Sequence, residues 1–469
     1  MKKFLIRLFL SSIPLYVQAQ TVLSYEINAE FFPEDAQMYN YPVPSESFMR
    51  ATSSIRLSEV EDSVVIFYLH GELKIDSIQS GGNKINYDYD KVLYNYEYSR
   101  VALKVIVNSS DLVDESLNVF YSGFFNPSKA GALSNYMHIN QNSGVYLRGY
   151  GYSLWFPVFI DAYQDSYKAD FNKVAITLPT GFKCIVSGEL VEEKSDDANY
   201  LAIWKPGFTD IFDILCTARK FKLNTKDNVY VYYLTDKSSS DKVLEYSIGL
   251  RKLFSQKLKS IDASDPLFVM EMPKYGDISS GNVVGISEEL FNSFETDIKS
   301  KLTIAHELVH PFVKIPVTKE NPFYAFVIEG FPSFFQFYAL KRMDKDNYNL
   351  DEVMRNVEKS YLEKRRTGKT SRGNELPDEK AILNISSEEI GTYKDKFVLS
   401  DRVWLFFYNI WTQMGEEKFD MFLKELFSFS SINYESFENL ISKYIPDFKD
   451  ALNTWLNTTN YPEAFRIVK

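Results

Sequence analysis

Two histidines and a glutamate, in the sequence H-E-L-V-H at residues 306–310, have the types and spacing of a metal site that performs chemistry. The chain has only 4 His in 469 residues, and two of them occur here, four positions apart. Residues at i and i+4 lie on one face of a helix, so both imidazoles would converge on one point. This pattern is typical of zinc sites in which the glutamate, Glu307, acts as general base. Pro311 follows and lacks an N–H, so we expect the helix to end or kink there.

A catalytic zinc needs three protein ligands and one open position, so a third ligand must join His306 and His310. We predict Glu329, which lies on the next expected helix with 18 residues between it and His310. Two antiparallel helices joined by a loop can bring this carboxylate to the histidine pair. One bound Zn²⁺ would lower the pKa of a water and polarise a carbonyl oxygen, while Glu307 takes the proton and passes it to a leaving amine.

Two other interpretations of the motif remain open from the sequence. The histidines could be structural, or the site could bind a metal without turning over a substrate. The two histidines outside the motif, His70 and His138, lie in strand-like or loop segments and are expected to be ordinary surface or core residues.

The segment after Thr225 must position the motif, and here the pattern changes from strands to helices. An extended run at 229–234 is followed by helical periodicity from 242 to 260, and short strands are expected at 267–272 and 282–286. Further helices are expected at 294–311, 325–343, 350–365, 397–414, 416–427, 434–444 and 447–457, with a polar loop at 366–374. A small sheet followed by a helical lobe therefore carries the motif.

The first half of the chain has the pattern of an all-β domain of sandwich or saddle type. Alternating apolar runs separated by turn residues occur at 63–68, 101–107, 117–121 and 174–178. The tyrosine-dense segment 87–98 could be an aromatic platform for sugars or peptides. We favour a hairpin surface and edge strand, because Tyr has a high strand propensity.

Residues 1–19 have the pattern of a cleavable secretory signal. Lys2, Lys3 and Arg7 precede a short apolar stretch at 8–16, which ends near Ala19. This stretch is too short to span a bilayer, and no later window offers 18 uncharged apolar residues. The sequence therefore predicts an exported protein, periplasmic or extracellular, without a membrane span.

Charge and cysteine content narrow the classes of partner and cofactor. Lys+Arg 52 against Asp+Glu 63 gives a net charge of -11, which disfavours a general electrostatic grip on nucleic acid. The only cysteines, Cys184 and Cys216, lie in expected strands and could form a disulfide or remain buried free thiols. They do not have the close spacing of a thiolate metal site.

The motif with its spacing resembles the aminopeptidase N family of gluzincin zinc peptidases. In that family H-E-x-x-H is followed by eighteen residues and a Glu in an N-E-G-F-like context, as in Glu329-Gly330-Phe331 here. Weaker similarities to the family's β-saddle occur at 155–157, 169–171, 178–181 and 186–188. The resemblance implies a β-saddle domain at 20–224, a thermolysin-like, mainly helical α+β catalytic domain at 225–469, and a peptide or protein substrate.

The family also places a tyrosine sixty-odd residues after the zinc glutamate, where its phenol hydrogen-bonds the oxyanion. Tyr393 lies 64 positions after Glu329 and just before an expected helix. The resemblance therefore implies that Tyr393 is the oxyanion donor.

Two departures and the length of the chain limit what the family implies. Ser279 stands where the family's G-A-M-E-N segment has the glutamate that binds a free α-amine, and Asp277 could replace that glutamate only geometrically. Gln336 replaces a second family glutamate. Only 76 residues follow Tyr393, which leaves no room for the helical domain that restricts many relatives to peptide ends. We therefore expect an open cleft and altered or lost recognition of free N-termini.

The strand expected at 282–286 would form the edge along which an extended substrate pairs. We accordingly assign substrate binding to Ser279, Gly281, Asn282 and Val283. The alternative function is a zinc-holding but catalytically weak surface protein, whose tyrosine-rich β domain binds glycans or other proteins.

Overall fold

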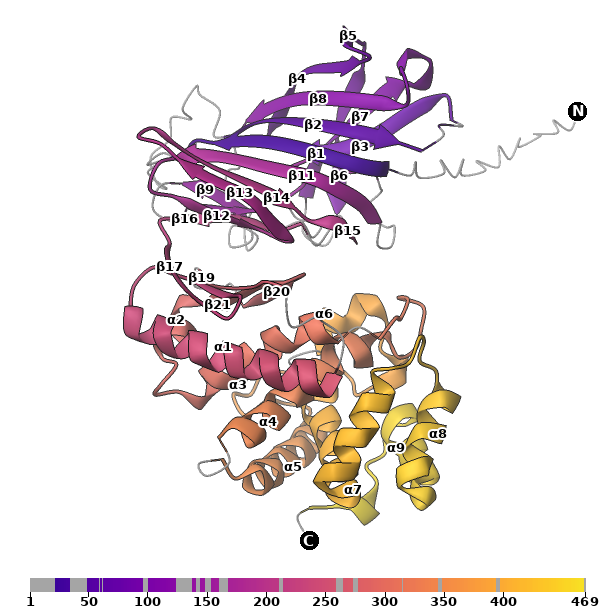
Figure 1. Ribbon diagram of the computed structural model, residues 1–469. Coiled ribbons are helices and arrows are strands. Elements are labelled where there is room, and N and C mark those ends of the chain that lie inside the picture. The colour runs from indigo at the N-terminus through magenta and orange to yellow at the C-terminus, as the bar shows by residue number, and fades with distance from the viewer. Residues whose placement is uncertain are drawn as a thin grey trace, which may run out of the picture. The chain divides into compact units, whose positions relative to one another are not determined.

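The computed structural model consists of two compact units, which are described separately (Figure 1). One unit is Met1–Cys184 with Leu190–Thr217, and the other is Ile185–Glu189 with Ala218–Lys469. The residues described are 22–33, 49–58, 60, 62–95, 100–123, 137–140, 144–147, 153–159, 168–210, 214–258, 265–272, 277–313, 315–344, 348–393 and 397–467. The predicted signal at 1–19 lies outside them. In the described part of the chain, no helix is long and apolar enough to cross a membrane.

A nine-stranded sheet dominates the first unit. Its order is β13-β14-β11-β1-β2-β8-β4-β5, with β15 also paired to β11. Its strands are β1 (Val22–Phe31), β2 (Met49–Leu57), β4 (Leu73–Ser80), β5 (Asn83–Lys84), β8 (Ser116–Gly123), β11 (Lys168–Pro179), β13 (Glu189–Ser195), β14 (Asn199–Lys205) and β15 (Gly207–Asp210). Only the central β1–β11 pair is parallel among the pairings recorded for this sheet. On its buried side Tyr25 stacks on Phe171, with ring centroids 4.8 Å apart, and Phe156 meets both rings edge-on.

Two smaller sheets complete the β-rich part. One has the order β3-β7-β6 and the other β12-β16-β10-β9. Their strands are β3 (Val64–His70), β6 (Asp88–Asn95), β7 (Arg100–Asn108), β9 (Met137–Asn140), β10 (Gly144–Leu147), β12 (Lys183–Val186) and β16 (Cys216–Arg219). The described residues also include a 3-10 helix, η1 (Ser109–Asp111). The β-rich first half expected from the alternating pattern is confirmed.

The second unit begins with a five-stranded sheet in the order β17-β18-β19-β21-β20. Its strands are β17 (Lys222–Lys226), β18 (Val229–Tyr233), β19 (Leu267–Met272), β20 (Ile278–Ser280) and β21 (Val283–Ser287). The pairs β18–β19 and β19–β21 are parallel, whereas β17–β18 and β20–β21 are antiparallel. The expectation that 282–286 forms an edge was wrong, because β21 lies between β19 and β20, and β20 is the edge strand.

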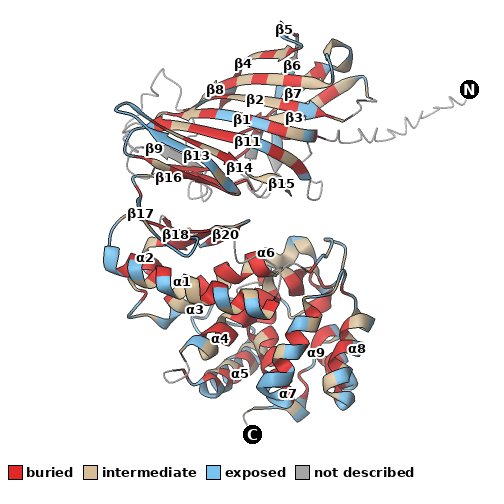
Figure 2. Cartoon of the chain, viewed as in Figure 1, coloured by how far each residue is buried: buried red, intermediate tan, exposed pale blue. Residues whose placement is uncertain are grey.

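Helices form the rest of this unit. The α-helices are α1 (Lys237–Leu258), α2 (Glu288–Asn292), α3 (Ile298–Val309), α4 (Phe331–Met343), α5 (Leu350–Thr367), α6 (Ile390–Tyr393), α7 (Val403–Leu426), α8 (Tyr434–Tyr444) and α9 (Lys449–Asn457). Shorter turns are η5 (His310–Phe312), η6 (Phe326–Gly330), η7 (Ile382–Asn384), η8 (Ser387–Glu389), η9 (Val398–Arg402), η10 (Pro446–Phe448) and η11 (Glu463–Phe465). Most of α4 is buried, whereas α5 and α8 bury one side and expose the other (Figure 2). The predicted helical lobe is confirmed.

The sequence separated helices at 397–414 and 416–427, and the structure explains this boundary. Helix α7 runs through both segments, but Gly415 has φ 72° and ψ 169°, which are not helical angles. Glycine adopts a positive φ without the steric penalty that other residues meet. The first of these segments begins as the π-helical turn η9, which the hydrophobic pattern did not predict.

Candidate metal centre

Helix α3 carries the H-E-L-V-H motif with one apolar and one open side. Asp297 caps its N-terminus by accepting a hydrogen bond from the Lys299 N–H at 2.9 Å. The side chains that bury this helix recur at helical spacing: Ile304, Ala305, Leu308 and Val309. The three polar residues of the motif are each only partly buried. The apolar side of α3 therefore fixes the helix and leaves the motif facing outward from the core.

The helix ends within the motif, as we predicted from Pro311. Helix α3 ends at Val309, and His310 begins the 3-10 turn η5 with Pro311 at its second position. Proline has no N–H to donate to the carbonyl four residues earlier, so the regular helix cannot continue through it. His310 keeps helical backbone angles, with φ -49° and ψ -47°, and its ring therefore stays on the face of His306.

Glu329 comes from the neighbouring segment, in the π-helical turn η6 that leads into α4. Helix α4 packs against α3, which brings the two segments together. Pro332 lies in the first turn of α4 and cannot donate to the carbonyl of Ile328. The wider turn at η6 accommodates this missing hydrogen bond, and π-helical turns occur frequently at functional sites.

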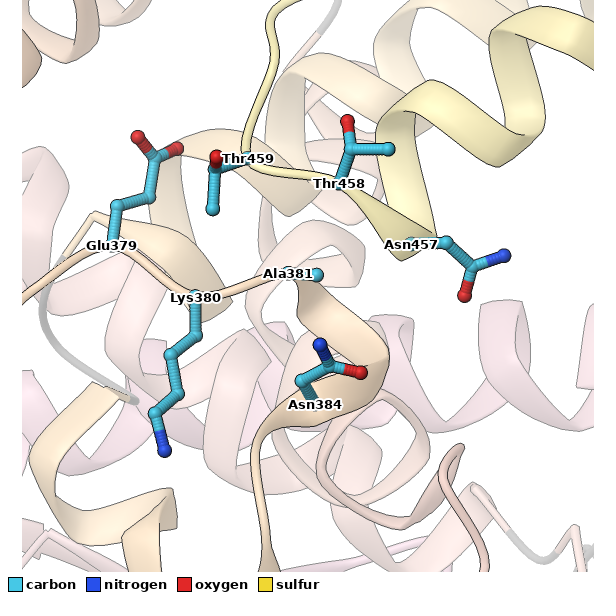
Figure 3. A pocket seen from close by; sticks show the side chains of 7 residues that line it. All are labelled: Glu379, Lys380, Ala381, Asn384, Asn457, Thr458 and Thr459. Carbon is cyan, nitrogen blue, oxygen red and sulfur yellow. The ribbon is translucent and has the colours of Figure 1, made fainter.

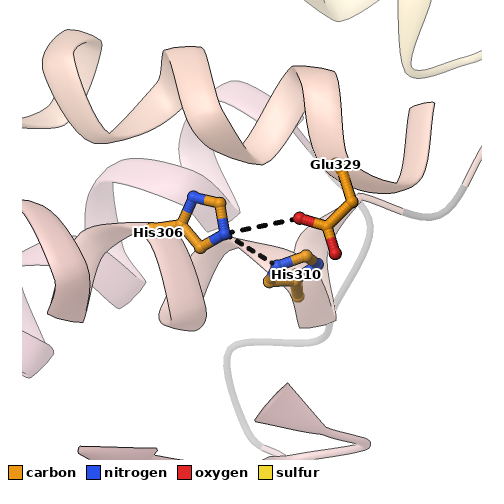
Figure 4. A group of neighbouring side chains, drawn as sticks. All are labelled: His306, His310 and Glu329. Atoms are coloured by element: carbon orange, nitrogen blue, oxygen red, sulfur yellow. Dashed lines mark hydrogen bonds and ion pairs between the residues drawn. The ribbon is translucent and has the colours of Figure 1, made fainter. Parts of the chain in front are cut away.

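His306, His310 and Glu329 converge on one point (Figure 4). His306 Nε2 lies 3.3 Å from His310 Nε2 and 3.7 Å from Glu329 Oε2, and one ligand atom of each residue lies within 4.8 Å of the others. Metal–ligand bonds of about 2.0–2.1 Å in a tetrahedron separate the ligand atoms by roughly 3.3–3.4 Å. The distance between the two imidazole nitrogens therefore matches the edge of such a tetrahedron, whereas the Glu329 carboxylate would have to move closer to hold the same ion.

The three side chains are partly open to solvent. The side chains of His306 and Glu329 retain 21% and 17% of their accessible surface. A catalytic zinc site needs an open fourth position, and this exposure would provide it. Glu307 is also partly buried and directly follows His306 on α3, the position expected for a general base. In the described part of the chain, no other group of three His, Cys, Asp or Glu side chains gathers in this way.

Tyr393, the predicted oxyanion donor, is the last residue of α6 and is 3% exposed. Its hydroxyl donates a hydrogen bond to the carbonyl of Asp378 at 2.7 Å. Burial raises the pKa of Tyr393, which keeps the phenol protonated and able to donate. A role as oxyanion donor would require the hydroxyl to exchange Asp378 for the substrate, so this role remains a prediction.

The edge strand β20 contains Ser279, which the sequence resemblance predicts at the position of the family's amine-binding glutamate. Ser279 pairs with Val284 of β21, and β20 packs against both α3 and η5, the elements that carry the two histidines. Ser279 is only partly buried. Ser279 has a hydroxyl and no carboxylate, so it could not form an ion pair with an ammonium group.

Other polar side chains of the β20–β21 hairpin bind the protein itself. Asp277, the one carboxylate among residues 277–287, accepts a hydrogen bond from the Ser287 N–H at 2.7 Å. The hydroxyl of Ser280 lies 3.2 Å from that of Ser187. The Asn282 amide accepts from the Gly188 N–H and donates to the Gly188 carbonyl, each at 3.0 Å. Of the predicted substrate-binding residues, Asn282 therefore holds the hairpin turn to residues 187–188.

The remaining two predicted substrate-binding residues shape the hairpin. Gly281 occupies the turn with φ +57°, and a Cβ there would lie 3.7 Å from the Ser187 Cβ. Val283 is fully buried inside the sheet. Ser187 and Gly188 were not among the predicted site residues, although the family-like run at 186–188 was the available signal.

Several other residues singled out from the sequence have defined environments. Gln336 donates to the carbonyl of Ser333 on its own helix at 2.7 Å. His70 is buried, and its Nδ1 accepts from the Glu72 N–H at 3.2 Å. Cys184 and Cys216 are buried free thiols whose sulfur atoms lie 3.9 Å apart, and burial raises the pKa of Cys184 well above its usual value. The described part of the tyrosine-dense segment forms β6, the edge of a three-stranded sheet, as favoured.

Solved structures with a similar fold were found, but no family model and no curated protein matches the sequence. The structure of an M1 zinc metallopeptidase from Deinococcus radiodurans is 13% identical with a TM-score of 0.61, and the match covers 96% of each chain. A mutant of that enzyme bound to a Tyr-Ser-Ala substrate gives 12% identity and a TM-score of 0.62, with 96% of this chain and 97% of that chain covered. A mutant two-domain M1 zinc metallopeptidase bound to L-arginine gives 13% and 0.62 over the same shares.

These similarities extend over both units of the chain. Identities of 12–13% establish the fold alone, and this is the fold of M1 zinc metallopeptidases, the aminopeptidase N family. The protein therefore combines that fold with a candidate metal group of the composition that zinc peptidases require.

Proposed function

We propose that the protein is an exported zinc metallopeptidase of the aminopeptidase N family that hydrolyses peptide bonds in peptides or proteins. The observation that carries this proposal is the convergence of His306, His310 and Glu329 within 4.8 Å on an M1 metallopeptidase fold. The separation of the two imidazole nitrogens matches the edge of a tetrahedral zinc site. We propose one Zn²⁺ per chain, and a catalytic domain of the thermolysin-like type at 225–469.

The residues around the metal group have separate roles in this proposal. Bound zinc supplies a water of lowered pKa and an electrophile for the carbonyl oxygen. Glu307 directly follows His306 on α3, beside the metal ligands. In this role it takes a proton from the attacking water and delivers it to the leaving amine. Tyr393 donates its phenol hydrogen to the oxyanion after leaving the Asp378 carbonyl.

Substrate recognition is proposed to differ from that of aminopeptidases in the family. An extended substrate pairs with the free edge of β20 and lies beside the histidine helix. Ser279 offers no charge to an α-ammonium group, and Asp277 is held by the Ser287 N–H. We therefore propose that the enzyme cleaves N-blocked or internal segments at least as well as peptides with a free N-terminus.

The test combines metal analysis with paired substrates. Purified protein should contain close to one equivalent of zinc, lose activity with a chelator and regain it when Zn²⁺ is restored. Two fluorogenic peptides of one sequence, differing only in an acetylated N-terminus, should be cleaved with similar kcat/KM. Absence of stoichiometric zinc would contradict the proposed enzyme class. Cleavage of the free-amine peptide alone would contradict the proposed recognition.

A further inference from the structure

We propose that a second π-helical turn sets the position of the metal-ligating Glu329, and that Ser333 and Arg402 are positioning residues for this carboxylate. The inference rests on the proposed function, since it concerns a side chain assigned there to zinc. The turn that carries Glu329 is η6, and the second turn is η9, which contacts it directly.

The direction of Glu329 depends on the wide turn that contains it. An α-helix rotates by about 100° per residue, so a change in the number of residues in the turn would rotate the carboxylate away from the imidazoles. Pro332 removes one hydrogen bond of a regular helix at this point but does not itself fix the wider form. A further set of contacts is therefore needed to hold η6 in the form that directs Glu329 at His306.

Those contacts come from Val403, directly after η9, and from a buried hydroxyl of α4 that bonds to the η9 backbone. A Cβ added to Gly330 would come within 3.4 Å of Val403 Cγ1, directly after η9, and within 3.0 Å of Phe326. The Ser333 hydroxyl, 4% exposed, lies 2.9 Å from the Gly330 carbonyl and 2.9 Å from the Leu399 carbonyl. Ser333 thus connects the last residue of η6 to the backbone of η9.

The second turn is itself held in an uncommon conformation. The Arg402 N–H donates to the Phe397 carbonyl at 3.0 Å, which closes a turn of five residues. Phe397 has φ 38°, a value that non-glycine residues adopt only when the surroundings enforce it. Asp401 in the same turn is buried and pairs with Lys364 of α5.

The Arg402 side chain fixes this turn to two other segments. It is wholly buried, and its guanidinium donates to Tyr361 Oη and Glu379 Oε1, both at 3.0 Å. Its remaining bonds go to the backbone carbonyls of Thr454, Trp455, Thr458, Thr459 and Asn460. The guanidinium therefore caps the C-terminal end of α9, where the carbonyls have no helical partners.

The hydrogen bonds of Arg402 to Tyr361, Glu379 and the end of α9 form an anchor for η9. One side of this anchor borders a pocket. Glu379, Thr458 and Thr459 line an open pocket of about 390 Å³, together with Lys380, Ala381, Asn384 and Asn457 (Figure 3). The guanidinium of Arg402 is enclosed, so its charge relies on Glu379 and the carbonyls for compensation. Removing one partner of such a buried pair leaves an uncompensated charge, which is strongly destabilising, so the pair resists separation.

The test compares Ser333→Ala with Ser240→Ala, a control that removes another buried serine hydroxyl from the same unit. Ser240 is fully buried on α1 and accepts a hydrogen bond from Asn224 at 3.3 Å. The readouts are the Zn²⁺ dissociation constant of the folded apoprotein, from competition with a chromophoric chelator, and the visible spectrum of the Co²⁺ form. We expect Ser333→Ala to weaken Zn²⁺ binding roughly tenfold and to alter the Co²⁺ bands, as for outer partners of metal ligands. Ser240→Ala should leave both readouts unchanged.

Unchanged Zn²⁺ affinity and an unchanged Co²⁺ spectrum in Ser333→Ala would overturn the proposal. An equal change in Ser240→Ala would overturn it too, because general destabilisation would then explain the effect. A wild-type protein that binds no zinc would instead contradict the proposed function, and this inference with it.

Arg402→Lys tests the anchor itself. Lysine keeps a positive charge beside Glu379 but lacks the planar fork that binds several carbonyls. We expect weaker Zn²⁺ binding, by at least the factor seen for Ser333→Ala, in protein shown to be folded by circular dichroism. If the variant does not fold, a second variant, Thr459→Pro, leaves the side chain of Arg402 intact while altering the segment that it caps, and the same loss of Zn²⁺ affinity is expected. Wild-type affinity in a folded Arg402 or Thr459 variant would exclude the anchor from the positioning of Glu329.

Discussion

The metal group and the β20–β21 hairpin use their polar side chains in opposite ways. In the metal group, His306, His310 and Glu329 turn toward one shared point and remain partly exposed. In the hairpin, Asp277 and Asn282 turn toward the protein backbone and hold it in place. Both regions lie in the same unit, and β20 packs against the helix that carries His306.

In the proposed function, the metal group would cleave the bond, whereas the hairpin would decide whether a free peptide end is recognised. The metal group has all the donors that a catalytic zinc needs. The hairpin has backbone edges and hydroxyl groups, but its one carboxylate is occupied by the Ser287 N–H. This contrast is the basis of the proposal that the protein hydrolyses peptides with a weakened or lost preference for free N-termini.

The largest expected effect comes from Glu307, the proposed general base. Glu307→Gln should lower kcat/KM by roughly 10³-fold while zinc content stays at one equivalent, because a positioned acid–base group contributes about 10²–10⁴-fold. Activity on a fluorogenic peptide and metal analysis of the same sample provide the measurement. Glu289→Gln, on the exposed side of α2, is the matched control and should retain full activity. A fully active Glu307→Gln would show that the metal group does not perform the proposed chemistry.

The next largest effect should come from Asn282, which bonds the β20–β21 hairpin to Gly188. Asn282→Ala removes bonds to both backbone groups of Gly188 and one to the Pro266 carbonyl. We expect the free energy of unfolding to fall by about 2 kcal/mol and KM to rise, with kcat changed less, because the substrate edge loosens. Urea denaturation and steady-state kinetics measure the two effects.

A control separates the two consequences of that change. Asn433→Ala removes a helix cap from α8, with a loss of about 1 kcal/mol, and should leave KM unaltered. If both variants raised KM equally, the hairpin would have no specific part in substrate binding.

A negative charge at the edge strand should raise the preference for peptides with a free N-terminus. Ser279→Glu places a carboxylate at the position of the family's amine-binding glutamate, and a charge-assisted hydrogen bond is about twice as strong as a neutral one. The preference for a free-amine peptide over its acetylated form should rise roughly tenfold, since about 1.4 kcal/mol corresponds to that factor. Ser279→Gln has the same shape without the charge and should show no such rise. A wild-type enzyme that already rejects acetylated peptides would remove the contrast on which this prediction depends.

The smallest expected effect is the pH dependence of the free energy of unfolding, through the partly buried contacts of Asp420. Asp420 of α7 accepts hydrogen bonds from Lys257 and from Tyr338 of α4, and it pairs with Arg342. Burial raises the pKa of Asp420, but the bonds from Lys257 and Tyr338 and the charge of Arg342 outweigh it and leave the pKa below its usual value. The stabilisation is therefore present above the unfolded pKa of about 3.9 and is lost as pH falls through the folded pKa.

Urea denaturation between pH 6 and pH 3 measures this effect. The free energy of unfolding should fall toward the acidic end on account of Asp420, because protonation removes the carboxylate that Lys257 and Tyr338 bind. Asp420→Asn should be less stable at pH 6 and should show a flatter dependence below pH 4. An unchanged slope in this variant would show that other carboxylates govern the acid transition.

Much of the architecture could be predicted because hydrophobic periodicity is local. The strand at 267–272 and the helix at 434–444 have the predicted bounds, and Pro311 ends α3 as expected. The wrong assignment of the edge strand has an equally clear cause. The apolar run at 282–286 shows that a strand is buried but not which strands pair on either side of it. The turn η9 was missed because a π-helical turn has the composition of an ordinary helix.

The sequence by itself determined which residues could hold the metal, because ligand chemistry and the spacing along a helix are properties of the chain alone. Only the tertiary structure decided which hydrogen-bond partners the polar groups outside the metal group have. Asn282 finds Gly188 94 positions away, and Ser333 reaches Leu399 66 positions away. Such partners depend on strand order and helix packing, so no local pattern specifies them. The same long-range contacts underlie the proposed substrate edge and the proposed positioning of Glu329.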